Sequence, residues 1–125
     1  MGKTAAELVA EAKGRIENLT VDQVAAEVAA GDVVVVDLRE PEELAATGKI
    51  PGSIHVPRGM LEFRADPTSS YHDSALDPSR RVILHCAAGG RSALAAAALQ
   101  DMGYQSVAHL DGGFTAWQRA GQPVE

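Results

Sequence analysis

Apolar residues near the start of the chain recur at helical spacing, which predicts an amphipathic helix over residues 5–18. The positions that form its apolar face are Leu8, Ala12, Ile16 and Leu19. A second helix is predicted over residues 21–30, and Gly31 is expected to end it. Thr20 and Gln23 fit a capping box for this second helix, because each side chain can satisfy a free backbone N–H at its start.

Short, continuous apolar runs follow. The valines of residues 33–36 are typical of a strand buried on both faces, as in a parallel sheet. Three more short runs are interpreted as strands in the same way: 53–56, 82–85 and 107–110.

Predicted helices separate these strands. Pro41 followed by two glutamates is typical of a helix start, and Gly48 is expected to end that helix. Further helical segments are predicted over residues 60–65, 92–102 and 114–120, and residues 66–81 are predicted to form a long loop. Strands that alternate with helices indicate an α/β fold, in which helices flank a parallel sheet on both faces.

Composition and charge narrow the classes of function. Hydrophobic residues make up 46% of the chain and charged residues 22%, which is ordinary for a globular protein. The formal net charge of -6 gives no general attraction to nucleic acid or to an anionic membrane, so neither is expected as a partner. No apolar run approaches the roughly 20 residues of a membrane span, and the charged N-terminal segment lacks a signal-peptide core. We therefore expect a cytoplasmic protein.

The single cysteine, Cys86, stands at the predicted C-terminal end of a strand. One cysteine excludes an internal disulfide and any metal site that needs two thiolates. Four small residues follow it, and a basic residue comes next: Ala87, Ala88, Gly89, Gly90 and then Arg91. Small residues allow the backbone N–H groups of a loop to turn inward, and the next helix adds its positive N-terminal end. A sulfur in this place should ionise readily, which indicates a nucleophile rather than a packing residue.

Several segments together resemble the rhodanese family, and the resemblance runs from about Thr20 to the C-terminus. The segments that carry it are Asp37–Glu40, Gly48–Pro57, Cys86–Ser92, Leu110–Trp117 and Gly121–Val124. The resemblance implies a rhodanese-like domain over residues 20–125 that follows an N-terminal helical extension over residues 1–19.

The resemblance also implies a chemistry. Rhodanese relatives move a sulfane sulfur from a small-molecule donor, typically thiosulfate, to the loop cysteine as a persulfide. The persulfide then passes its sulfur to cyanide or to a thiol, and the acceptor can be a protein. By this resemblance Cys86 is the nucleophile, the backbone of residues 87–91 binds the charged persulfide, and no metal or organic cofactor is needed.

Two alternatives remain at this stage. Cdc25-type phosphatases and the arsenate reductases that resemble them share the fold, but five residues separate their cysteine from their arginine. Only four separate Cys86 from Arg91, and a smaller loop suits one sulfur atom better than a phosphate. A sulfur-carrier or docking module with weak turnover would need the same persulfide, so the composition of the loop does not exclude it. Ala87 and Ala88 also differ from the charged or bulky residues of thiosulfate-specific relatives, which leaves the donor open.

Other residues are candidates for roles near the site. Asp37 and Arg39 match an Asp-x-Arg motif of the family, and an internal ion pair is favoured over substrate contact. Arg58 could bind the sulfonate end of a donor, or it could be a solvated surface arginine. His85 precedes the cysteine on a strand and is therefore expected to point to the opposite face of the sheet, in a structural role. The remaining histidines show no ligand spacing: His55, His72 and His109.

Overall fold

A computed structural model describes residues 2–125, so of the predicted N-terminal extension only Met1 lies outside the described residues. The helices are α1 (Ala5–Lys13), α2 (Val21–Ala30), α3 (Pro41–Thr47), α4 (Leu61–Ala65), α5 (Gly90–Asp101) and α6 (Gly113–Arg119), and η1 (Arg58–Met60) is a short 3-10 helix. The strands are β1 (Glu17–Leu19), β2 (Val34–Asp37), β3 (Ile54–His55), β4 (Arg81–His85) and β5 (Ser106–Leu110).

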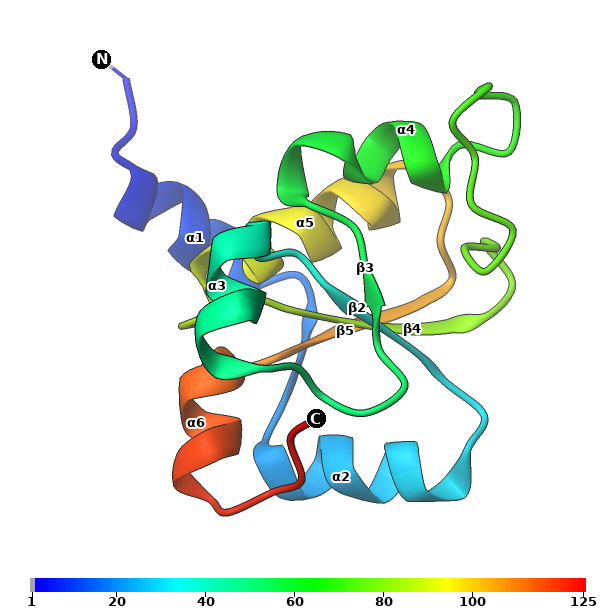
Figure 1. Ribbon diagram of the computed structural model, residues 1–125. Helices are drawn as coiled ribbons and strands as arrows, with labels where there is room; N and C mark the ends of the chain where they lie inside the picture. Colours follow the sequence, from blue (N-terminus) through cyan, green and yellow to red (C-terminus); the bar gives the residue numbers. More distant parts are fainter. Residues whose placement is uncertain (1) are drawn as a thin grey trace.

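The strands form a five-stranded parallel sheet in the order β1-β5-β4-β2-β3. Helices α1, α4 and α5 cover one face, and α2 and α6 cover the other (Figure 1). The predicted α/β class, with a parallel sheet between two layers of helices, is confirmed.

Each face of the sheet carries its own hydrophobic core. On β4, Val82 and Leu84 belong to the core under α5, whereas Ile83 belongs to the core that includes Phe114 and Trp117 of α6. Because successive side chains on a strand point to opposite faces, a strand buried on both faces needs apolar residues at consecutive positions. This is the physical reason for the continuous apolar runs in the sequence.

The N-terminal segment differs from its prediction. The helix expected over residues 5–18 ends at Lys13, and residues 17–19 form strand β1, which pairs with β5 at the edge of the sheet. Ile16 packs in the core under α5 while Leu19 packs in the core on the other face. Their three-residue spacing therefore imitates a helix face, although the two side chains lie on opposite sides of the sheet.

The second helix is confirmed over residues 21–30. The Thr20 hydroxyl accepts from the Gln23 N–H at 3.2 Å, the Gln23 side chain accepts from the Thr20 N–H at 2.9 Å, and Gly31 ends the helix. The helix predicted over residues 92–102 begins two residues earlier, at Gly90. Among the described residues, no helix is long and apolar enough to cross a membrane.

Candidate active site

The site lies where the C-terminal ends of the three central strands meet. Strand β4 ends at His85, and Cys86 follows directly between the ends of its neighbours β2 and β5. Parallel sheets bind ligands beyond the C-terminal ends of their strands, where connections diverge to opposite faces. Cys86 itself is only 1% exposed.

Two backbone N–H groups donate hydrogen bonds to the sulfur of Cys86. The Gly89 N–H donates to Cys86 Sγ at 3.1 Å, and the Ser92 N–H donates to it at 3.4 Å. Gly89 adopts a φ of 107° at the start of α5, a conformation that an L side chain would strain. These donors and the N-terminal end of a twelve-residue helix favour negative charge on the sulfur.

Helix α6 fixes the first peptides of the loop. The Phe114 N–H donates to the Cys86 carbonyl at 2.8 Å, and the Thr115 N–H donates to the Ala87 carbonyl at 3.1 Å. In a trans peptide the N–H points opposite to the carbonyl, so the N–H groups of Ala87 and Ala88 point away from α6. The orientation of these two loop donors is thus set by α6.

Arg91 belongs to the first turn of α5, and its guanidinium binds Glu43 of α3. The two distances are 2.8 Å from Nη1 to Oε1 and 3.0 Å from Nη2 to Oε2. The bond to Arg91 lowers the pKa of Glu43 to about 2. The pKa of Arg91 is raised, first by Glu43 and to a lesser extent by the nearby Cys86 sulfur. The Glu43 carboxylate therefore compensates the positive charge of Arg91 that follows the cysteine in the sequence.

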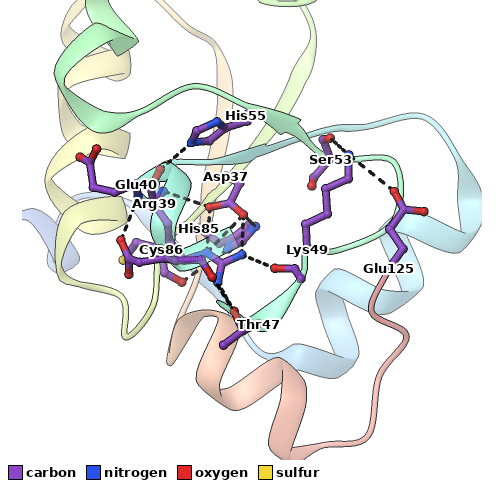
Figure 2. Close-up of polar contacts among 12 residues, drawn as sticks. Asp37, Arg39, Glu40, Thr47, Lys49, Ser53, His55, His85, Cys86 and Glu125 are labelled. Atoms are coloured by element: carbon purple, nitrogen blue, oxygen red, sulfur yellow. Dashed lines mark hydrogen bonds and ion pairs between the residues drawn. The ribbon is translucent and has the colours of Figure 1, made fainter. Parts of the chain in front are cut away.

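Asp37 and Arg39 form the internal ion pair favoured by the sequence (Figure 2). Both Nε and Nη2 of Arg39 donate to the carboxylate, and the other bonds of the guanidinium reach Thr47 Oγ1 and the Gly48 carbonyl, each at 2.8 Å. The guanidinium carbon lies 4.0 Å from the centroid of the Phe114 ring. Burial opposes ionisation of Asp37, but its hydrogen bonds to Arg39 lower its pKa overall.

His85 is fully buried and lies against Asp37 and Phe114. Its Nε2 is 3.7 Å from Asp37 Oδ2 and has no hydrogen-bond partner, and its ring stacks on Phe114 at a centroid distance of 6.1 Å. Burial lowers the pKa of His85, while Asp37 acts in the opposite direction. The side chain thus packs among the residues under the loop.

Arg58 contacts Leu38 and Glu62. It begins η1, its backbone N–H donates to the Leu38 carbonyl, and its Nη1 donates to Glu62 at 2.8 Å. A hollow of about 200 Å³ lies beside Ala87, with Glu43 and Thr115 among its lining residues. Within residues 2–125, no group of three His, Cys, Asp or Glu side chains is placed to hold a metal ion.

The sequence assigned no role to four residues that either bind Arg91 or are linked to the sulfur by hydrogen bonds. Glu43 binds Arg91, and a hydrogen-bonded chain runs from the sulfur through Ser92 and His109 to Asn18. Ser92 could have been considered because it ends the family motif around the cysteine. Glu43, His109 and Asn18 are far from Cys86 in the sequence and carry no motif of their own.

The comparisons with known proteins agree on one family. The model of the rhodanese-like domain matches residues 20–120. A sulfurtransferase of Allochromatium vinosum is 37% identical over 93 residues, which cover 74% of this chain and 78% of that protein. A thiosulfate sulfurtransferase of Ectopseudomonas mendocina is 37% identical over 105 residues, which cover 82% of this chain and 85% of that protein.

One solved structure superimposes along the whole chain. It is a Rhodopseudomonas palustris protein of unknown function, described as a possible tyrosine phosphatase. It is 45% identical, has a TM-score of 0.94, and covers 100% of this chain and 96% of its own. The family model spans the strand that precedes Cys86, the loop after it and helix α6. The parallel sheet, the cysteine loop and these matches together show that the chain belongs to the rhodanese-like domain family.

Proposed function

We propose that the protein is a sulfurtransferase that carries sulfur as a persulfide on Cys86. The main support for the proposal is that the Gly89 and Ser92 N–H groups at the start of α5 donate hydrogen bonds to Cys86 Sγ. Such donors stabilise a thiolate and would equally stabilise a persulfide anion. The names of the relatives from A. vinosum and E. mendocina support the same reaction class.

The reaction consists of two displacements at sulfur. The Cys86 thiolate attacks the outer sulfur of a donor such as thiosulfate, the S–S bond of the donor breaks, and sulfite leaves with the electron pair. A thiolate or cyanide then attacks the outer sulfur of the persulfide, and Cys86 leaves as a thiolate again. No net oxidation occurs at the cysteine over a full cycle, so the reaction needs no cofactor.

The loop supplies the binding groups for the transferred sulfur. The N–H groups of Ala87 and Ala88 are turned away from α6 and are free to face the persulfide. Gly89, Gly90 and Arg91 complete the turn into α5, so their N–H groups lie at the positive end of the helix. We assign Arg58, whose Nη1 donates to Glu62, to the sulfonate end of a donor.

A second candidate is hydrolysis of a phosphate ester, and one observation favours it. The R. palustris protein that superimposes at a TM-score of 0.94 is described as a possible tyrosine phosphatase. A thiolate in a loop of N–H groups with an arginine nearby could also attack phosphorus. The loop has only four residues between Cys86 and Arg91, and Glu43 already binds that arginine, so we rank sulfur transfer first.

The test compares two assays on the same purified protein. We expect thiocyanate to form from thiosulfate and cyanide, and we expect Cys86→Ser to abolish its formation. An aryl phosphate is offered in parallel. Phosphate release without thiocyanate would reverse the ranking. A persulfide detected by mass spectrometry without repeated turnover would instead indicate a sulfur carrier that delivers to a protein acceptor.

A further inference from the structure

A buried chain of hydrogen bonds leads from the sulfur to the edge strand β1. Cys86 Sγ lies 3.6 Å from Ser92 Oγ, and Ser92 Oγ lies 2.8 Å from His109 Nδ1. His109 Nε2 in turn lies 2.8 Å from Asn18 Oδ1. Ser92 and His109 are both fully buried, so bulk water does not compete for these bonds.

Asn18 fixes the position of the proton on His109. The Asn18 Nδ2 group donates to the Lys13 carbonyl at 3.0 Å and to the Ile16 carbonyl at 3.2 Å. The oxygen of the amide therefore faces His109, and because an amide oxygen can only accept, His109 Nε2 must carry a hydrogen. The neutral imidazole then presents its lone pair at Nδ1 to Ser92.

Ser92 has one hydroxyl hydrogen and several acceptors around it. His109 Nδ1 at 2.8 Å is closer than the Gly89 carbonyl at 3.3 Å, so the hydroxyl donates to the imidazole. Its oxygen then faces the sulfur as an acceptor, which suits a neutral thiol. When the sulfur is a thiolate, the Ser92 hydroxyl can donate its hydrogen to the sulfur. The bond between Ser92 and His109 then persists only if His109 Nδ1 carries a hydrogen and donates it to the Ser92 oxygen.

We propose that His109 is a positioning residue that takes up the thiol proton of Cys86 through Ser92. The S–H bond of Cys86 breaks as an O–H bond forms at Ser92, and the original Ser92 hydrogen moves to His109 Nδ1. No proton leaves the protein in this step, and the products are a thiolate and an imidazolium joined by Ser92. The inference rests on the proposed function because it concerns how the reactive thiolate of Cys86 forms.

The charges around His109 are compatible with this role. Besides Cys86, the titratable groups that face it are Lys13 of α1 and Asp111 after β5, which form an ion pair at 3.0 Å. Burial lowers the pKa of His109, Asp111 raises it and Lys13 lowers it further. Because burial disfavours an isolated imidazolium, the charge on His109 must be balanced by the thiolate that forms in the same step.

The first test follows the rate of alkylation of Cys86 by iodoacetamide between pH 5 and pH 9, beside the ultraviolet absorbance of the thiolate. In His109→Gln we expect a rate about tenfold lower at pH 7, the effect of losing one hydrogen bond to a charged group. The double variant Ser92→Ala/His109→Gln should be no slower than Ser92→Ala, because His109 acts through Ser92. His72→Gln, which alters a loop histidine bound to the Leu76 carbonyl, is the control and should match the native profile.

A second measurement needs no His109 variant, in case that variant does not fold. Nitrogen-15 spectra of the native protein should show His109 Nδ1 protonated at the pH values near neutrality at which the thiolate is observed. In Cys86→Ala, Nδ1 should lose its proton at a lower pH, because no thiolate is present to stabilise the imidazolium. If Nδ1 stays unprotonated throughout, or if the profile of a folded His109→Gln superimposes on the native one, the relay is disproved. Both measurements use the free thiol, so a protein that shows the relay but makes no thiocyanate would disprove only the proposed function.

Discussion

Arg91 and Glu43, forty-eight residues apart in the sequence, form a bidentate ion pair near Cys86, with distances of 2.8 and 3.0 Å. The pair joins the first turn of α5 to α3. If the donor is an anion such as thiosulfate, as proposed, Glu43 would both neutralise Arg91 and repel the donor. We therefore expect the pair to influence which donors the site accepts.

Glu43→Gln should improve the use of anionic donors. Loss of the carboxylate leaves Arg91 with an uncompensated charge, and we expect the KM for thiosulfate to fall by about two- to fivefold, the range of a partly exposed ion pair. Glu42→Gln changes an exposed neighbour on the same helix and should have little effect. Steady-state thiocyanate formation at low and high salt measures both. A KM that is unchanged or higher would mean that Arg91 does not contact the donor.

Gly113→Ala should distort the cysteine loop. A Cβ at this position would lie 2.5 Å from the Ala87 carbonyl oxygen and 2.6 Å from that of Cys86. Gly121→Ala is a matched control, because its φ of 73° is also left-handed but its Cβ would meet no atom within 4 Å. We expect Gly121→Ala to cost about 1 kcal/mol of stability without loss of activity.

Gly113→Ala should cost more stability than Gly121→Ala and lower the thiocyanate rate at least about tenfold, because small misplacements of a reactive group have large effects on rate. Urea unfolding and steady-state assays measure these two effects. Equal stability and activity in the two variants would show that the loop tolerates a shift of its carbonyls.

Arg39→Met should strongly destabilise the protein. It leaves the fully buried Asp37 carboxylate without its partner, and breaking a buried ion pair costs about 3–5 kcal/mol. Arg58→Met breaks the partly exposed pair with Glu62 and should cost less than about 1 kcal/mol. Urea unfolding compares the two. A double variant, Asp37→Leu with Arg39→Met, should be more stable than Arg39→Met alone; if it is not, the cost arises from lost packing on Phe114.

Stability should fall as the pH falls below about 6.5, the ordinary pKa of histidine. Burial lowers the pKa of His85 in the folded protein, so the unfolded chain binds a proton that the folded one does not. The stability that this group contributes is complete above about pH 6.5 and is lost toward lower pH, by up to about 1.4 kcal/mol per pH unit. Urea unfolding at pH 7.5, 6.5 and 5.5 in His85→Leu should give a shallower slope than in the native protein. An identical slope would assign the effect to other groups.

Much of the fold follows from local sequence. The capping box of Thr20 and Gln23 starts α2 at the expected residue, because its hydrogen bonds join positions only three apart. The apolar run over residues 82–85 marks β4, because burial on both faces requires consecutive apolar side chains. The place of Cys86 at the end of that strand follows from the same run. Local hydrogen bonding and burial were therefore sufficient to locate the sulfur and the loop after it.

The tertiary structure decided what surrounds that sulfur. Strand β1 exists because residues 17–19 pair with β5, and no helical or strand period within so short a segment could reveal it. The same pairing brings Asn18 to His109, and the packing of α5 on β5 brings His109 to Ser92. Glu43 meets Arg91 only because α3 and α5 both begin near the C-terminal end of the sheet. Sequence determines which residues favour a strand, a turn or a cap, but pairs between distant residues depend on how the strands are ordered, and that order is set by the packing of the whole sheet.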